Sequence, residues 1–305
     1  MRRGATGLCG VIAVDKPAGM TSHDVVDAVR RTFGERRCGH VGTLDPAATG
    51  LLLVAVGPAT RLCSFLGGHD KSYVARIAFG TGTDTDDADG TVVERAEVDA
   101  RLEDEDVARG LLGRFRGDLM QVPPAYSALK RQGKRAYEVA RAGGTPELSG
   151  RPVHVASADL VDVCVDDGVL CWDVRFVVST GTYIRALARD LGHEAGTCAH
   201  LSALRRMSIG DVSVSQALSL DELADTPFEQ ACLDPAAALG FPCHELSGAD
   251  ARKVASGGKL SLGLGFEGDV VSLVRDGRLL ALYERRAGCY APRAVIPGGV
   301  FGVRA

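Results

Sequence analysis

The chain has 305 residues, of which 46% are hydrophobic and 24% are charged. These proportions are ordinary for a folded, soluble protein and exclude a disordered chain, and the length favours two domains over one. The net charge of −4 argues neither for nor against a nucleic-acid partner, but residues 245–305 carry nine Lys and Arg against six Asp and Glu, so any polyanion contact is expected to be local.

No stretch of the sequence predicts a membrane span or a secretory signal. The longest apolar run, residues 51–56, is too short to cross a bilayer. Asp15 and Lys16 interrupt the apolar residues near the start before a signal-peptide core could form. We therefore expect a cytoplasmic protein. The nine cysteines include no Cys-x-x-Cys pair and no zinc-ligand spacing, so we expect reduced thiols and no metal site.

The first part of the chain alternates between buried strands and short helices. Apolar residues recur at helical spacing between Thr21 or Ser22, which can cap a helix, and Gly34, which can end it. The other expected elements are a buried strand over 11–14, a buried strand over 51–56, a short helix over 58–65 and an alternating strand over 71–79.

The rest of the chain predicts further helices and strands and then a small β module. The expected elements are a helix over 103–115, a hairpin of strands 153–163 and 170–178, a helix from about 184 to 191, helical structure over 215–240, and short strands over 270–274, 278–283 and 294–296. Phe241-Pro242 marks a boundary between two domains. The predicted domains are therefore residues 1–242 and 243–305.

Residues 39–50, with the sequence GHVGTLDPAATG, predict a structured loop that holds Asp45. Pro46 disfavours the α conformation for the residue before it, so the Asp45 carboxylate stands on an extended or turn-like backbone. Two interpretations remain open: Asp45 closes a surface turn, or its carboxylate is directed at a substrate.

Two clusters of basic residues also allow two interpretations each. Arg30, Arg31, Arg36 and Arg37 either stabilise a helix C-terminus or bind phosphates. Lys130, Arg131, Lys134 and Arg135 are interleaved with Tyr126 and Tyr137, which suits either backbone binding with base stacking or a solvated helix entry.

The positions of Tyr73 and Arg185 in predicted elements make both of them candidate functional residues. Tyr73 lies near the start of a predicted strand, where its ring can fill the core or reach an adjoining cleft. Arg185 lies in the first turn of a predicted helix, where a cation opposes the helix dipole. An acidic partner would explain this placement, and Asp45 is one candidate.

Residues 80–90 contain four aspartates but do not match a calcium loop. Position five of an EF-hand pattern is occupied by Ala88 and position six by Asp89. We expect a solvated acidic turn. The same segment has only two glycines of the dinucleotide fingerprint, so no nucleotide cofactor is expected.

Six blocks of residues occur in order between about residues 10 and 210. They are Asp15-Lys16-Pro17-x-Gly19-x-Thr21-Ser22, Gly39-His40-x-Gly42-Thr43-Leu44-Asp45-Pro46-x-Ala48-Thr49-Gly50, Lys71-x-Tyr73, Asp84-x-x-Asp87-x-Asp89-Gly90, Tyr126-Ser127-Ala128-Leu129-Lys130 and Gly181-Thr182-Tyr183-Ile184-Arg185. Together they closely resemble the bacterial tRNA pseudouridine-55 synthases, the TruB-type pseudouridine synthases. The C-terminal β module resembles the RNA-binding PUA-type domain of many members.

This resemblance implies a fold and an activity. The fold is α+β, with a mixed, mostly antiparallel central sheet, flanking helices and a small PUA-like domain. The activity is an isomerisation: a uridine in the T-loop of tRNA, at position 55, loses its N-glycosidic bond, and the base turns and rejoins the sugar through C5. The uridine must be flipped out of the folded loop. No cofactor is implied.

The resemblance also assigns roles to residues. Asp45 matches the catalytic aspartate, as a nucleophile or as the base that starts an elimination, and Arg185 matches the arginine that pairs with it. Tyr73 matches the tyrosine that stacks on the base and can transfer a proton at C5. His40 matches a residue that fills the vacated space. Further predicted substrate-binding residues are Lys16, Gly42, Thr43, Leu44, Tyr183, Lys130, Arg36 and Arg37; we expect Lys16 to shape the floor of the site.

The expected partner is tRNA, bound through its T-arm by a monomer without an obligatory protein partner. The basic clusters and the tail domain would bind the tRNA backbone, and the shape of the T-loop would give specificity. The sequence argues against two other functions. The combination of Asp45, Tyr73 and Arg185 argues against an RNA folding factor without catalysis. The absence of a second matched carboxylate or of a metal cluster argues against a small-molecule hydrolase.

Overall fold

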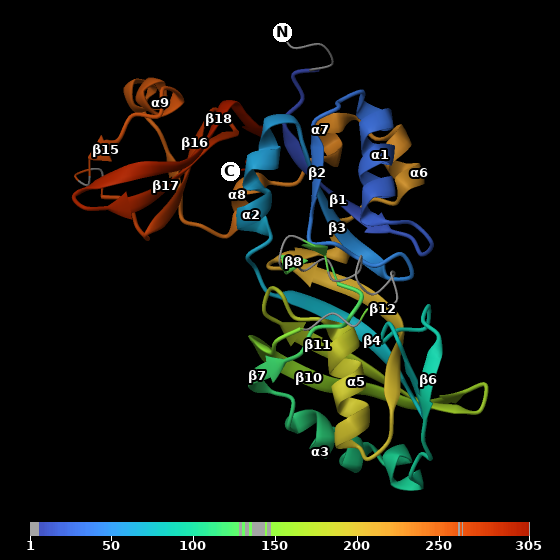
Figure 1. Cartoon of the computed structure of the whole chain (residues 1–305). Coiled ribbons are helices and arrows are strands. Elements are labelled where there is room, and N and C mark those ends of the chain that lie inside the picture. Colours follow the sequence, from blue (N-terminus) through green and yellow to red (C-terminus); the bar gives the residue numbers. More distant parts are fainter. Residues whose placement is uncertain are drawn as a thin grey trace. The chain divides into compact units, whose positions relative to one another are not determined.

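The computed structural model describes residues 6–127, 144, 148–261, 263 and 265–304, and the backbone of 130–131 and 134–135. The chain forms two compact units (Figure 1): the first comprises Met1–His69 and Ser208–Ala305, and the second Asp70–Met207. The predicted domain boundary after residue 242 falls inside the first unit and stays a prediction. Among the described residues, no helix is long and apolar enough to cross a membrane.

The first unit contains a strand, β3, that is covered on both faces. β3 (Thr49–Val56) pairs antiparallel with β1 (Gly10–Lys16) on one side and with β2 (Cys38–Val41) on the other. Residues 52, 54 and 56 face a hydrophobic cluster that includes α1 (Ser22–Phe33), and residues 51, 53 and 55 face a second cluster. Burial of both faces explains why this strand is an unbroken apolar run instead of an alternating one.

The predicted helix after Thr21 is confirmed as α1. The Thr21 hydroxyl accepts a hydrogen bond from the Asp24 amide (3.1 Å), and the Asp24 carboxylate accepts one from the Thr21 amide (2.8 Å), which together form a capping box. Gly34 ends the helix with a φ of 66°, as expected for a glycine C-cap. In Figure 1, α1 lies beside α6 (Leu220–Asp225).

The remaining helices of the first unit are short. The predicted helix over 58–65 is a 3-10 turn, η1 (Gly57–Leu62), followed by α2 (Cys63–Leu66). The predicted helical region 215–240 is divided into η3 (Val214–Gln216), α6, α7 (Phe228–Ala231) and α8 (Pro235–Leu239). Ser219 and Asp234 cap α6 and α8, and Pro227 lies at the start of α7. These residues favour new helix starts over one continuous helix.

The C-terminal β module is also part of the first unit. Its strands, in spatial order, are β14 (Cys243–Glu245), β16 (Val270–Arg275), β17 (Arg278–Arg286), β18 (Cys289–Phe301) and β15 (Leu260–Ser261), and α9 (Gly248–Ala255) packs on them. The three predicted strands are confirmed, each longer than expected. Leu279, Leu282 and Ile296 share a hydrophobic cluster with Leu51 and Leu53 of β3, so the module and the N-terminal strands have a common core.

The second unit is built on antiparallel strands. In spatial order they are β12 (Ala199–Ile209), β4 (Lys71–Phe79), β11 (Val169–Val178), β10 (Arg151–Asp166) and β7 (Gly117–Gln121). The predicted hairpin is confirmed as β10 and β11, and β11 also pairs antiparallel with β4. Trp172 on β11 is fully buried against Phe79 and donates a hydrogen bond to the Leu102 carbonyl (2.8 Å). The strand β12 was not predicted; its last two residues belong to the first unit and pair with β13 (Val212–Ser213).

Among the described residues, the second unit also contains helices and small hairpins. They are η2 (Ala100–Glu103) with α3 (Glu105–Gly113), α5 (Ile184–Glu194), β5 (Thr81–Thr83) with β6 (Val92–Arg95), and β8 (Lys130–Arg131) with β9 (Lys134–Arg135). The predicted helix over 103–115 is therefore shorter at both ends. Antiparallel pairing in both units, with helices packed on the strands, confirms the predicted α+β class.

Gly192 lets α5 approach the start of β12. A Cβ atom at this position would lie 2.4 Å from the Ala199 amide nitrogen and 2.7 Å from the Ala199 Cβ. We expect Gly192→Ala to lower the free energy of unfolding by about 1–3 kcal/mol, since backbone atoms must move. Gly110→Ala in α3 is the control, because nothing lies within 4 Å of its Cβ position, and it should stabilise the chain by about 0.5–1 kcal/mol. Urea unfolding measures both; equal stability of Gly192→Ala and wild type would contradict the clash.

Candidate active site

The loop that carries Asp45 lies in the first unit and is shorter than predicted. Gly39 and His40 belong to β2, and β3 begins at Thr49, so the loop proper spans residues 42–48. The Leu44 amide donates to the Ser22 hydroxyl (2.9 Å), which in turn donates to the Leu44 carbonyl (3.1 Å). These two bonds fasten the residue before Asp45 to the first turn of α1.

Lys16 also stabilises the loop that carries Asp45. Its side chain is fully buried, and its ammonium group donates hydrogen bonds to the carbonyls of Pro17 (2.8 Å), Met20 (2.6 Å) and Pro46 (3.0 Å). The Pro46 carbonyl also accepts a bond from the Gly19 amide (2.9 Å). Burial of the ammonium agrees with the expected role of Lys16 in shaping the floor of the site, and its contact with a substrate stays a prediction.

The other predicted site residues of this unit near Asp45 in the sequence differ in burial and backbone conformation. Gly42 has a φ of 69°, which favours glycine at the start of the loop. Thr43 is exposed, whereas Leu44 is buried. Asp45 is half-buried. His40 is half-buried on β2, and its ring meets the edge of the His23 ring from α1 at a centroid distance of 6.5 Å.

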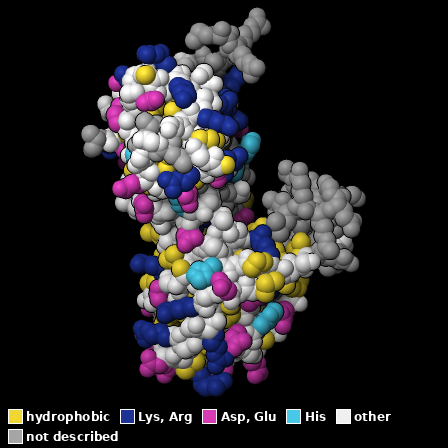
Figure 2. Space-filling view, turned by 90° about the vertical axis from the view of Figure 1, so that its left-hand side faces the viewer, with side chains coloured by type: hydrophobic (Ala, Val, Ile, Leu, Met, Phe, Trp, Pro, Cys, Tyr) yellow, Lys and Arg dark blue, Asp and Glu magenta, His cyan; other side chains and the backbone are white. Residues whose placement is uncertain are grey.

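The arginines in the last turn of α1 and just after it belong to the first unit. Arg31, Arg36 and Arg37 are exposed, whereas Arg30 is paired with Asp27 at 2.7 Å. The Arg37 guanidinium donates to the Thr60 hydroxyl (2.9 Å). Figure 2 shows acidic and basic side chains interspersed on the face in view, without a single field of one charge.

Tyr73 and Lys71 lie on the buried face of β4, in the second unit. Only 8% of the Tyr73 surface is exposed, and the residue is paired with Phe176 of β11. The predicted alternation of this strand is confirmed, because residues 71, 73, 75, 77 and 79 are all buried. Burial of the Tyr73 ring is compatible with both interpretations drawn from the sequence, a core residue and a wall of a cleft.

Lys71 gives this face a titratable group. It is 7% exposed; burial, helped by the charge of Arg206 and opposed by Asp70, lowers its pKa from 10.5 to about 8. Because the folded pKa is below the unfolded one, the unfolded chain binds more protons between these values, and stability rises with pH across that window. We expect Lys71→Met to stabilise the chain at pH 7, by up to about 3 kcal/mol, and the gain to shrink from pH 8 to pH 10.5. Urea unfolding of both proteins at pH 7 and 9.5 measures this; a pH-independent difference would contradict it.

Arg185 is held at the start of α5, as predicted. It is 6% exposed and forms an ion pair with Asp87 at 3.3 Å. Its guanidinium also donates to the carbonyls of Thr85 (3.0 Å) and Tyr126 (3.1 Å). Asp87 thus supplies an acidic partner within this unit. The predicted pairing of Arg185 with Asp45 joins residues of the two units and stays a prediction.

The acidic turn is not the solvated loop that the sequence led us to expect. Asp86 is buried, adopts a φ of 60° and pairs with Arg189 of α5 at 2.9 Å. Burial, which outweighs the neighbouring Arg189 and Arg185, raises the pKa of Asp86. Asp87 accepts a bond from the Thr85 hydroxyl (2.6 Å). The acidic composition of this turn predicts solvated aspartates. In the structure, Arg189 and Arg185, one helical turn apart on α5, form ion pairs with Asp86 and Asp87. Asp89 remains exposed, as expected.

Tyr183 lies at the N-cap of α5. Its backbone is held on both sides by Gln121, which accepts from the Tyr183 amide (2.9 Å) and donates to its carbonyl (3.1 Å). The Arg151 guanidinium covers one face of the Tyr183 ring at 4.7 Å from the centroid. Lys130 lies in β8, and its side chain falls outside the described residues.

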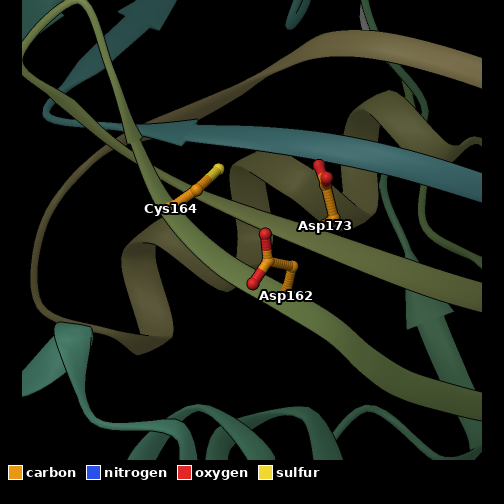
Figure 3. Close-up of side chains that lie close together, drawn as sticks. All are labelled: Asp162, Cys164 and Asp173. Atoms are coloured by element: carbon orange, nitrogen blue, oxygen red, sulfur yellow. The ribbon is translucent and has the colours of Figure 1, made fainter.

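One cluster of the second unit has the composition of a metal site. Asp162 and Cys164 of β10 and Asp173 of β11 point toward one another (Figure 3), with ligand atoms within 4.8 Å. Both carboxylate oxygens of Asp173, however, accept hydrogen bonds from Arg76, each at 2.8 Å. Burial raises the pKa of Cys164, which disfavours the thiolate a metal would need. Because Arg76 already neutralises Asp173, we assign the cluster no metal.

Solved structures with a similar fold support the architecture. The archaeal box H/ACA sRNP Nop10-Cbf5 complex contains a chain that matches 94% of this chain and 86% of its own length, with a TM-score of 0.64 and 23% identity. A chain of a Cbf5-Nop10-Gar1 complex matches 93% and 83%, with a TM-score of 0.66 and 24% identity. At these identities the likeness concerns the fold, which is the α+β fold expected from the sequence.

Comparison of sequences places the chain in a family. The profile of "TruB family pseudouridylate synthase (N terminal domain)" matches residues 30–184, and that of "tRNA pseudouridylate synthase B C-terminal domain" matches residues 185–237. The tRNA pseudouridine synthase B of Thermobifida fusca (strain YX) is 47% identical over 293 residues, which cover 95% of this chain and 99% of that protein. That of Mycobacterium sp. (strain KMS) is 44% identical and covers 90% and 92%. The chain therefore belongs to the TruB family of pseudouridylate synthases.

Proposed function

We propose that this protein isomerises a uridine of tRNA to pseudouridine, and that the uridine is position 55 in the T-loop. The observation that carries the proposal is identity of 47%, over nearly the full length of both proteins, with a tRNA pseudouridine synthase B. The six ordered sequence blocks support it, because they contain each residue to which we assign a role in the reaction.

The chemistry requires one carboxylate that can act more than once. The N1–C1′ bond of the uridine breaks, the base turns, a C5–C1′ bond forms, and the C5 proton is lost while N1 gains one, so substrate and product are isomers. Asp45 can serve as the nucleophile or as the base of an elimination, and can then be released in its original form. Its loop is fastened on both sides of Asp45, through Ser22 at Leu44 and through Lys16 at Pro46, which limits movement of the backbone that carries the carboxylate.

Arg185 and Tyr73 would serve this carboxylate and the base, respectively. A guanidinium favours the ionised form of a neighbouring carboxylate and orients it. The Arg185 side chain is already oriented by Asp87 and two carbonyls, so little conformational freedom is left to lose on binding. Tyr73 offers a ring for stacking on the flipped uracil and a hydroxyl for proton transfer.

Binding of tRNA is proposed to rest on a few exposed cations and on shape. Arg31, Arg36 and Arg37 of the first unit can contact phosphates, as can exposed arginines of the C-terminal PUA-like module. The T-loop would be recognised by its folded shape. We propose that the chain acts in the cytoplasm as a monomer without an obligatory protein partner, whereas the similar Cbf5 chains were solved in complexes with other proteins.

The test is a reaction with an unmodified tRNA transcript. Purified protein is incubated with the transcript, and pseudouridine is mapped by chemical sequencing. We expect one modified position, uridine 55, and none in a transcript in which that uridine is replaced by cytidine. Absence of pseudouridine would refute the proposed function, and modification elsewhere in the tRNA would refute the assigned position. Faster tRNA folding without any product would favour the RNA folding factor.

A further inference from the structure

Arg206 of β12 is a charged residue in the interior of the second unit. None of its surface is exposed. Burying a guanidinium costs free energy unless hydrogen bonds compensate for the lost hydration. The residue takes no part in the reaction as described above, so its burial calls for a separate explanation.

The hydroxyl of Tyr73 is a hydrogen-bond partner of Arg206. β12 and β4 are neighbouring strands, and the side chains of Arg206 and Tyr73 are hydrogen-bonded to each other. Lys71, two residues before Tyr73, is buried on the same face of β4 and close enough to Arg206 for its pKa to be lowered by that charge. A second cation nearby makes the burial of Arg206 more costly.

The chemistry of the pair fixes the direction of the bond. Arginine has only donors, so the Tyr73 oxygen must be the acceptor. The hydroxyl proton of Tyr73 is then free to point elsewhere, and a donor on one side of the oxygen limits rotation of the C–O bond. A charged donor also makes the bond stronger than one between neutral groups.

We propose that Arg206 is a positioning residue for the reaction: its guanidinium fixes the Tyr73 ring and turns the Tyr73 hydroxyl proton toward the substrate. The proposal rests on the proposed function, because it assumes that Tyr73 contacts the uracil. Arg206 itself is fully buried and acts only through Tyr73.

A double-mutant cycle tests this. The proteins are wild type, Arg206→Met, Tyr73→Phe and the double variant; the single-turnover rate constant and the Kd for tRNA are measured for each. We expect each single variant to be about 10–100-fold slower with a Kd within about threefold of wild type, and the double variant to be no slower than the slower single one. Arg206→Lys, which keeps a charged donor, should recover part of the rate. Fully multiplied losses, or losses that appear in Kd alone, would overturn the proposal.

A matched control separates positioning from general damage to β4. Arg76 lies on the same strand, three residues after Tyr73, and pairs with Asp173. Arg76→Gln removes a charge from β4 without touching the Tyr73 hydroxyl, so its effect on the rate should multiply with that of Tyr73→Phe. Non-additivity as strong as that expected for Arg206 would indicate a general effect and would also overturn the proposal.

A thermal measurement keeps the proposal testable if the Arg206 variants do not fold. Tyr73→Phe alone deprives a buried guanidinium of an acceptor, so Tm should fall by about 3–8 °C. An unchanged Tm would show that the bond is not formed and would overturn the proposal. The Tm measurement does not depend on activity. If the wild-type protein formed no pseudouridine, the proposed function would be refuted, but the Tm of Tyr73→Phe would still report on the contact between Tyr73 and Arg206.

Discussion

Asp45→Asn is expected to lower the single-turnover rate of pseudouridine formation by at least about 10³-fold, with tRNA binding retained. The amide has nearly the shape of the carboxylate but can neither attack as an anion nor accept a proton. Two bonds that fasten the loop, one between Leu44 and Ser22 and one between Lys16 and Pro46, do not involve the Asp45 carboxylate. These two bonds should therefore be kept in the variant.

The measurement uses excess enzyme over radiolabelled tRNA, with Kd from filter binding. Asp27→Asn is the control, since Asp27 belongs to the same unit and forms a surface ion pair with Arg30; a pair of this kind contributes little, so its rate should stay within about twofold of wild type. If Asp45→Asn retained more than about a tenth of the wild-type rate, the catalytic role of Asp45 would be refuted even with the activity intact.

The fold was predictable where one local pattern dominated. β3 shows an unbroken apolar run, α1 has a cap, helical spacing and a final glycine, and β4 alternates. β12 was missed because its alternation is interrupted: Arg205 stands where the alternation of Ala199, Leu201 and Ala203 favours an apolar residue, and the next residue, Arg206, is the buried one. Arginine is among the residues least often buried, so sequence alone gave no reason to place Arg206 inside.

The candidate site was predictable in its residues but less in its contacts. Pro46 and the glycines indicated a structured loop around Asp45, and the change from strand to helix placed Arg185 in a first turn. The partner Asp87 was present in a family block, yet nothing local links it to Arg185, because the two segments lie about a hundred residues apart. The burial of Asp86 could not be predicted for the same reason, because its partner Arg189 is distant in the sequence.

Arg185→Lys is expected to lower the turnover rate by about 10²–10³-fold and to weaken tRNA binding by no more than about threefold. The guanidinium has several donors in one plane, and here they reach Asp87 and the carbonyls of Thr85 and Tyr126 at once. A lysine keeps the charge but cannot reproduce this planar set of bonds, so its ammonium would be free to move away from any carboxylate it should orient.

The control for Arg185→Lys lies one turn further along the same helix. Arg189 pairs with Asp86 and Asp190, and Arg189→Lys should affect stability more than turnover. Asp87→Asn should act in the same direction as Arg185→Lys but less strongly, because the two carbonyl bonds remain. Rate constants and Kd values for the three variants decide between two roles for Arg185. A loss mainly in turnover identifies a group that orients a reacting carboxylate. Equal losses in turnover and Kd would identify a phosphate contact, because such a contact is equally strong in the bound complex and in the transition state.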